Sequence, residues 1–250
     1  MMKSSKILFK IYSNTAVITL NNSKILNAWD SEMRNKICEI VNACNKNKLV
    51  KSIIITGSGT KGFCSGQDLN EITNKINTKI WIQSFKKVYY AIRSIEKPII
   101  AAVNGVAAGS GFQLALLADF IITHKRARFG QVEINNGIAS VTGPAIMKIF
   151  LGMSKTIELT LTGELIDGTE ASKLGFIHKL TSKKKVYSES LKIAKELESK
   201  SPTAMMLTKR NFWFMIKKDL DKAFKQAEKI HKISFKSKAP QTMSQKFLNS

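Results

Sequence analysis

The segment GVAAGSGFQLALLADF (residues 105–120) has three glycines and two alanines in its first seven positions and continues as an apolar helix. The strand PIIAAVNG (98–105) runs directly into it. Small residues let another group come close to the backbone, and the first N–H groups of a helix have no partner inside the helix. Since the helix dipole favours negative charge there, the junction is typical of a site for an anionic oxygen, or of a helix packed closely on its strand.

A second junction of this kind comes earlier in the chain. The strand KSIIITG (51–57) leads into GSGTKGFCSGQDLNEI (57–72), which again ends in a helical pattern. Two such loops side by side can aim backbone N–H groups at one oxygen, and pre-oriented donors of this kind stabilise charge that develops on a carbonyl. The pair of loops therefore predicts an oxyanion hole.

The surrounding pattern predicts an α/β core. Strands alternate with helices in the first half of the chain, which favours parallel strands joined by right-handed crossovers. The expected elements are a hairpin of ILFKIY (7–12) and TAVITL (15–20) around Ser13 and Asn14, a helix capped by Asp30 (30–47), the strand 51–57, a helix (78–96) stopped by Pro98, and the strand 98–105.

The pattern changes to helices after Gly130. We expect helices over 142–151, 155–162 and 168–174, a short strand FIHKL (176–180), and long helices rich in Lys and Glu up to the C-terminus. This change predicts two parts, a core over residues 1–190 and a helical region over 191–250.

The charge of the chain is strongly positive, with 40 Lys and Arg against 18 Asp and Glu and a net charge of +22. Such a charge attracts nucleic acid, anionic lipid or phosphorylated small molecules, or it reflects lysines that solvate helices. The lysines are spread over the whole chain and no aromatic residues are interleaved with them, so nothing marks a nucleic-acid module.

Cysteine and histidine usage gives no sign of a disulfide framework or of a metal site. The three cysteines have no C-x-x-C spacing, which fits a reducing compartment, and the three histidines have no paired spacing with other metal ligands. These residues are Cys38, Cys44, Cys64, His124, His178 and His231. The N-terminal 20 residues show strand patterns and no cleavage site, and we expect a cytoplasmic protein without a membrane span or a metal.

Both loops resemble segments of the crotonase (enoyl-CoA hydratase/isomerase) superfamily. GFCSGQDLNEI (62–72) is similar to its G-F-C-x-G-x-D-L-x-E signature, and KPIIAAVNGVAAGSGFQLALLADF (97–120) resembles its K-P-x-I-A-A-V-x-G-x-A-x-G-G-G-x-E-L-A-L-x-C-D segment. LNNSKILNA (20–28), ARFGQVEINNGI (127–138) and ELTLTGELIDGTEASKLGFIHKL (158–180) follow the family in order and spacing, so the resemblance covers almost the whole chain.

The resemblance implies a crotonase-like spiral of β and α turns with a helical C-terminal region for trimer assembly, as a homotrimer or as a hexamer of two trimers. Members bind acyl-CoA thioesters and hold the thioester oxygen as an enolate between two backbone N–H groups. By residue matching these donors are Gln67 and Ser110. Ser110 replaces the middle glycine of the usual triplet, which is tolerable if its dihedral angles suit a residue with a side chain.

The same resemblance implies a set of coenzyme A contacts, with the CoA thioester as substrate and no further cofactor. The implied contacts are Lys24, Ile25, Cys64 and Gly66, together with Lys246 and Phe247, which resemble residues that reach CoA from a neighbouring subunit.

Hydratases of the family use two glutamates, and Gln113 and Glu133 stand at those positions here. A carboxylate can take and return a proton near neutral pH, especially in an apolar pocket, whereas an amide can only donate and accept hydrogen bonds. With one carboxylate, the simplest reaction is isomerisation of a 3-enoyl-CoA to a 2-enoyl-CoA, with Glu133 as the only acid and base.

Other reactions remain open. Glu133 could activate water for hydration while Gln113 positions that water, and thioester hydrolysis or decarboxylation also uses an enolate-type hole. One branch of the superfamily binds RNA through a lysine-rich helix, but both loops and Glu133 are present here, which disfavours RNA binding as the main function. Trp81, Phe85 and Tyr89 lie at helical spacing and would narrow an acyl pocket or belong to the core.

Overall fold

The computed structural model describes residues 5–73 and 77–249, and its first feature is the predicted hairpin. Strands β1 (Ile7–Tyr12) and β2 (Thr15–Leu20) pair antiparallel. The turn between them places Ser13 at a φ of 54°, in the left-handed region. The predicted turn at Ser13 and Asn14 is therefore confirmed.

Four further strands extend this hairpin into one sheet. They are β3 (Ser52–Gly57), β5 (Ile99–Ala102), β7 (Phe120–His124) and β10 (Lys179–Thr181). The order is β1-β2-β3-β5-β7-β10, and every pair after the hairpin is parallel. This confirms the parallel sheet that the alternation of strands and helices predicts.

A second sheet, which sequence patterns did not predict, lies next to the first. It consists of β4 (Gly62–Cys64), β6 (Val106–Ala108), β8 (Arg128–Gly130) and β9 (Ile166–Asp167), in that order. The pairs β3/β4, β5/β6 and β7/β8 each give one strand to the large sheet and the next to the small one. Three turns of a spiral thus lie in register, and the two small-residue loops come at equivalent places in the first two turns.

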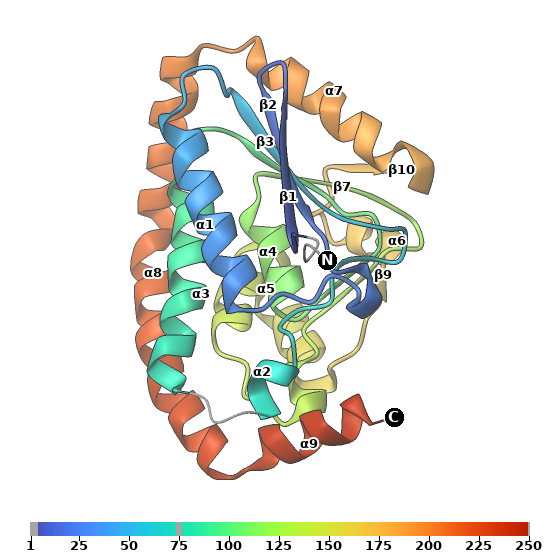
Figure 1. Cartoon of the computed structure of the whole chain (residues 1–250), viewed down its shortest axis with the longest axis vertical. Coiled ribbons are helices and arrows are strands. Elements are labelled where there is room, and N and C mark those ends of the chain that lie inside the picture. The colour runs from blue at the N-terminus through green and yellow to red at the C-terminus, as the bar shows by residue number, and fades with distance from the viewer. Residues whose placement is uncertain (1–4, 74–76, 250) are drawn as a thin grey trace.

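The strands β2, β3, β5 and β7 of the large sheet are covered on both faces (Figure 1), whereas the edge strand β1 is mostly exposed. One face carries Ile18, Ile53 and Ile55 and belongs to the main core, against α1 (Ser31–Lys46), α3 (Thr78–Ser94) and α4 (Ser110–Leu117). The residues that alternate with these pack on α7 (Val186–Glu198) on the other face. Burial on both faces explains why the strands are nearly uninterrupted apolar runs.

The helices of the second half extend the core. They are α5 (Thr142–Thr162), α6 (Gly168–Lys173), α8 (Pro202–Lys236) and α9 (Ala239–Leu248), with the short α2 (Asn70–Thr73) in the first half. In Figure 1 the long α8 runs beside α3, and α9 lies near α2. The predicted boundary between residues 190 and 191 falls inside α7, which packs on the sheet, and the division into two domains stays a prediction.

The two helices expected over 142–151 and 155–162 are confirmed, because α5 consists of two helical segments that meet at Gly152, where φ is 68° and ψ is 170°. One predicted element differs from the structure. The strand expected over 176–180 forms at Lys179–Thr181, because Phe176 and Ile177 are buried in the main core instead.

Asp119 fastens α8 to the edge of the core. Its carboxylate accepts hydrogen bonds from the backbone N–H of Ile99 at 2.8 Å and from Lys209 Nζ at 2.5 Å, and it pairs with Arg93 at 3.1 Å. The Lys209 side chain is only 4% exposed, so its charge depends on this partner. These contacts give Asp119, at the end of the segment 105–120, a structural role.

We predict that Asp119→Ala lowers the free energy of unfolding by about 3–5 kcal/mol, because it leaves the buried Lys209 ammonium without its counter-charge. Urea denaturation of the purified variant measures this. Glu158→Ala is the control, since it removes a surface pair with Lys155 and should cost under about 1 kcal/mol. Equal losses in the two variants would contradict the assignment.

Candidate active site

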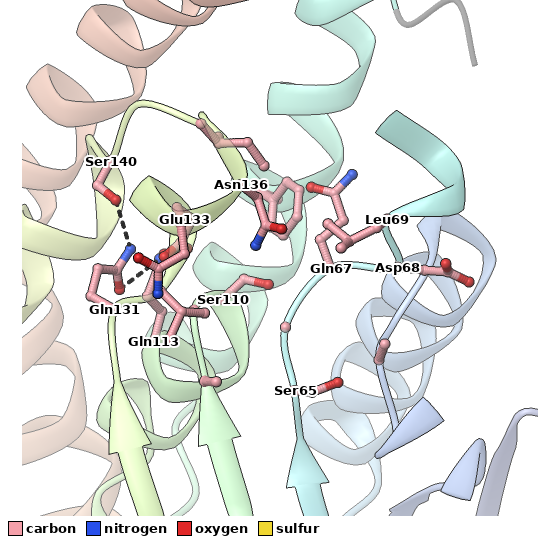
Figure 2. Close-up of a pocket in the computed structure, with 18 of the residues that line it drawn as sticks. Ser65, Gln67, Asp68, Leu69, Ser110, Gln113, Gln131, Glu133, Asn136 and Ser140 are labelled. Atoms are coloured by element: carbon pink, nitrogen blue, oxygen red, sulfur yellow. Dashed lines mark hydrogen bonds between the residues drawn. The ribbon is translucent and has the colours of Figure 1, made fainter. Parts of the chain in front are cut away.

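A pocket of about 570 Å³ lies between the two loops, α3, α8, α9 and the 3-10 turn Glu133–Asn136. It has a polar end, where Gln67, Ser110, Gln113 and Glu133 meet, and an aromatic wall that includes Trp81, Phe85, Tyr89 and Phe224. Figure 2 shows Ser110 and Gln113 on one side of this pocket and Gln67 and Asp68 on the other. The fold thus brings together the two predicted donors and the two predicted proton-handling side chains.

The first loop leaves the backbone N–H of Gln67 available. Trp29 pairs with Gln67 in a parallel bridge, in which Trp29 N–H bonds to the Gly66 carbonyl and Asp68 N–H bonds to the Trp29 carbonyl. Gln67 N–H, between these groups, bonds to no backbone carbonyl recorded among the described loops and turns. Because successive N–H groups in extended chain alternate in direction, Gln67 N–H points away from Trp29.

The second loop supplies Ser110 as the first residue of α4. The φ angle of Ser110 is not positive, so its backbone conformation suits a residue with a side chain, and serine can replace the usual glycine here. Its hydroxyl accepts a hydrogen bond from Trp29 Nε1 at 2.8 Å. Trp29, which sequence reasoning did not single out, therefore ties the serine side chain down while the backbone N–H stays at the start of the helix.

The glycines around Ser110 set the distance between the loops. Gly109 adopts φ 54° and ψ −128°, which a residue with a side chain rarely adopts. A Cβ on Gly111 would lie 2.1 Å from the carbonyl oxygen of Cys64, so the backbones of the two loops are in direct contact. A Cβ on Gly66 would lie 3.6 Å from Ser110 N. The two predicted donors therefore stand on touching segments.

Glu133 lies over Gly109, in the turn that follows β8. A Cβ on Gly109 would be 3.0 Å from Glu133 Oε1. Oε1 accepts a hydrogen bond from Gln113 Nε2 at 3.2 Å, and Oε2 is buried without a hydrogen-bond partner among the described residues. Burial raises the pKa of Glu133 to about 7. This carboxyl can hold or release a proton at neutral pH and presents one unoccupied oxygen.

Gln113 belongs to a network of neutral groups. Its carbonyl accepts hydrogen bonds from Tyr89 Oη at 2.8 Å and from Thr142 Oγ1 at 3.1 Å. The Gln113 nitrogen donates a hydrogen bond to Gln131 Oε1 at 3.3 Å, and Gln131 Nε2 donates in turn to Ser140 Oγ, as Figure 2 shows. Thr142 and Gln131 were not predicted as site residues, although Gln131 stands two positions before Glu133 in the same motif.

The predicted coenzyme A contacts are only partly brought together. Lys24, Ile25, Gly66 and Phe247 line the pocket, Phe247 from the same chain. Cys64 is fully buried at the end of β4, and Lys246 is exposed on α9; neither lines the pocket. The contact from a neighbouring subunit stays a prediction.

The aromatic residues of α3 have both of the roles considered for them. Trp81, Phe85 and Tyr89 line the pocket and also pack edge to face in one row, with ring centroids 5.5 Å and 5.9 Å apart. His231 on α8 packs edge to face on Trp81, with their ring centroids 5.0 Å apart, and also lines the pocket.

Comparison with known proteins identifies the family of the chain. The family model for enoyl-CoA hydratase/isomerase matches residues 10–249. The chain belongs to the enoyl-CoA hydratase/isomerase family. It is 30% identical over 225 residues to the short-chain-enoyl-CoA hydratase of Clostridium acetobutylicum and 32% identical over 225 residues to the crotonyl-CoA hydratase of Syntrophomonas wolfei, with 89% of this chain and 86% of each relative covered.

Solved structures support the crotonase fold of this family member. An enoyl-CoA hydratase from Mycobacterium avium subsp. paratuberculosis superposes with a TM-score of 0.88 at 22% identity, covering 98% of this chain and 96% of that one. An enoyl-CoA hydratase from Bacillus halodurans gives a TM-score of 0.88 at 23% identity, covering 96% and 99%. The resemblance seen in the loop motifs is thus confirmed at the level of family and fold.

Within residues 5–73 and 77–249, no helix has the length and apolar character needed to cross a bilayer. Within the same residues, no three His, Cys, Asp or Glu side chains gather in a way that could hold a metal ion.

We predict that Glu133→Gln stabilises the fold at high pH. The raised pKa means that the folded chain holds a proton that the unfolded chain releases, so wild-type stability falls as pH rises from about 4.5 to about 7. The variant lacks this loss and should be more stable above pH 7 by up to about 3 kcal/mol. Below pH 4.5 the two should converge.

Urea denaturation at acidic, neutral and basic pH measures the difference. Glu158→Gln, at an exposed position, is the control and should show no such dependence. A constant difference between Glu133→Gln and wild type at every pH would contradict the buried, titrating carboxyl.

Proposed function

We propose that this family member catalyses the reversible hydration of a 2-enoyl-CoA thioester through an enolate. The observation that carries the proposal is the buried Glu133 carboxyl, with a pKa near neutrality and a free oxygen, next to two loops that each offer a backbone N–H. The names of the hydratase relatives at 30% and 32% identity favour hydration over the isomerisation expected from the lone carboxylate.

The reaction needs one group that takes a proton and returns it. Glu133 removes a proton from water as the water oxygen bonds to Cβ, and the electron pair of the double bond moves through Cα onto the thioester oxygen. Gln67 and Ser110 N–H stabilise that oxyanion. The protonated Glu133 then gives its proton to Cα, and the carbonyl re-forms. A carboxyl with a pKa of about 7 can do both steps at neutral pH.

The pocket has room for the thioester along the first loop. Lys24, Ile25, Ser65, Gly66 and Phe247 line the pocket. We propose that the pantetheine arm and phosphates of CoA run along these residues, with the acyl group against Tyr89 and Phe85.

Isomerisation is the second candidate, and Gln113 favours it. An amide cannot act as a second acid or base, whereas migration of a double bond needs only one: Glu133 would take an α proton from a 3-enoyl thioester and return it at the γ carbon. No water is consumed in that sequence.

We predict that the purified protein adds one water to crotonyl-CoA, seen as loss of the conjugated ultraviolet absorption and a gain of the mass of water. In deuterium oxide the product should carry deuterium at Cα. Glu133→Gln should lower kcat by about 10²–10⁴-fold, the usual contribution of a general acid and base.

The same assay with 3-hexenoyl-CoA distinguishes the candidates. Migration of the double bond without addition of water would show that the protein is an isomerase and not a hydratase. Release of free CoA would indicate thioester hydrolysis. Glu158→Gln controls for nonspecific effects of the substitution, and an unchanged rate in Glu133→Gln would overturn both leading candidates.

A further inference from the structure

The Gln113 amide has two chemically opposite ends, and its neighbours decide which end faces Glu133. An ionised carboxylate can only accept hydrogen bonds, so it requires the nitrogen end. If the amide were reversed, its oxygen would stand about where the nitrogen now lies, 3.2 Å from Glu133 Oε1. Two acceptor oxygens at that distance repel each other. The orientation of Gln113 therefore bears directly on the charge that Glu133 can carry.

Two hydroxyl groups occupy the other end of the amide. Tyr89 Oη and Thr142 Oγ1 both donate to Gln113 Oε1, at 2.8 and 3.1 Å, from α3 and from the start of α5. Tyr89 is fully buried, and burial raises the pKa of its hydroxyl well above the usual value, so the donor keeps its hydrogen. Two donors saturate the carbonyl and leave the nitrogen to donate to Glu133 Oε1 at 3.2 Å and to Gln131 Oε1 at 3.3 Å.

We propose that Tyr89 and Thr142 are positioning residues, whose hydroxyls hold the Gln113 amide with its nitrogen toward Glu133 Oε1 so that Oε2 alone faces the substrate. The inference rests on the proposed function only for the role of Glu133 as acid and base. Glutamine at position 113 is then a fixed donor, rather than a weakened copy of a second carboxylate.

Two amide side chains act on Glu133: Gln113, through its contact with Oε1, and Gln131, which lowers the pKa of Glu133. The other ionisable side chains that line the pocket are Lys24, Asp68, Tyr89 and His231, from four different segments, with Arg34 and Cys64 close enough to Tyr89 to act on it. Among the described residues, none of these six hydrogen-bonds to Glu133. Burial lowers the pKa of His231 to about 4, so its titration is separate from that of Glu133.

The arrangement makes the carboxylate form easier to reach. A hydrogen bond from an N–H group favours the charged form and opposes the effect of burial. Without the hydroxyls the amide can turn, and Gln113 can then accept a hydrogen bond from the protonated Glu133. Loss of either hydroxyl should therefore raise the pKa of Glu133 and lower the fraction of Glu133 that is ionised, and so able to accept a proton, at neutral pH.

The experiment is a carbon-13 titration of ligand-free protein labelled at the glutamate side-chain carboxyl, with Glu133 assigned by the signal missing from Glu133→Gln. Tyr89→Phe should raise the pKa of Glu133 by about half a unit to one unit, the size of one net hydrogen bond. Thr142→Val should shift it in the same direction. Tyr90→Phe is the control, because Tyr90 bonds to Asp221 and does not line the pocket.

A double-mutant cycle tests whether the effect passes through the amide. In a Gln113→Leu background, Tyr89→Phe should cause no further shift. A pKa that does not move in either hydroxyl variant, or a Tyr89 effect that persists without the amide, would overturn the proposal. If Tyr89→Phe fails to fold, Thr142→Val provides the same test.

Turnover separates this inference from the proposed function. With crotonyl-CoA, the acidic limb of the kcat/KM profile, which reports the free enzyme, should move up by the same amount in Tyr89→Phe. If the titration shifts but no enoyl thioester reacts, the proposed function fails while the positioning role stands. If turnover is present and the titration does not move, the positioning role fails alone.

Discussion

The contact between the two small-residue loops is the constraint on which the site depends. Gly111 has no side chain because the carbonyl of Cys64 occupies that space, at 2.1 Å from where a Cβ would be. This contact joins the start of α4 to the end of β4 and sets Gln67 and Ser110 on adjoining segments. The spiral explains why the loops meet, since successive turns stack in register and place equivalent junctions next to each other.

Burial then gives Glu133 its chemistry. The carboxyl lies over Gly109 in the next turn of the spiral, where removal from water raises its pKa to about 7. Its hydrogen-bond partner at Oε1 is the neutral amide of Gln113 rather than a cation, and hydrogen bonds from its own backbone and from Gln131 lower the pKa by less than burial raises it. The long α8, fixed by Asp119 and Lys209, closes the aromatic side of the same pocket. The buried ion pair between Asp119 and Lys209 therefore stabilises the fold and also holds in place a helix that lines the pocket.

Much of the fold and the centre of the site could be predicted from the sequence. Hydrophobic runs and turn residues predict β1, β2, β3 and β5 of the large sheet, and the resemblance to the family implies Gln67, Ser110, Gln113 and Glu133. The small sheet could not be predicted, because its strands are two or three residues long and too short to show an alternation of apolar and polar residues. The roles of Trp29, Tyr89 and Thr142 depend on contacts between distant segments, as in the bond from Trp29 to Ser110, 81 positions away. Local patterns do not encode such contacts.

The central claim is that the two loops and Glu133 together generate and hold an enolate. The most direct measurement is the ultraviolet difference spectrum of acetoacetyl-CoA bound to wild type and to Gly109→Ala. We expect the enolate band of the ligand to appear with wild type. We expect it to be lost in the variant, because a Cβ at Gly109 would lie 3.0 Å from Glu133 Oε1 and φ 54° does not suit alanine. Binding without an enolate band in wild type, or the same band in both proteins, would contradict the account.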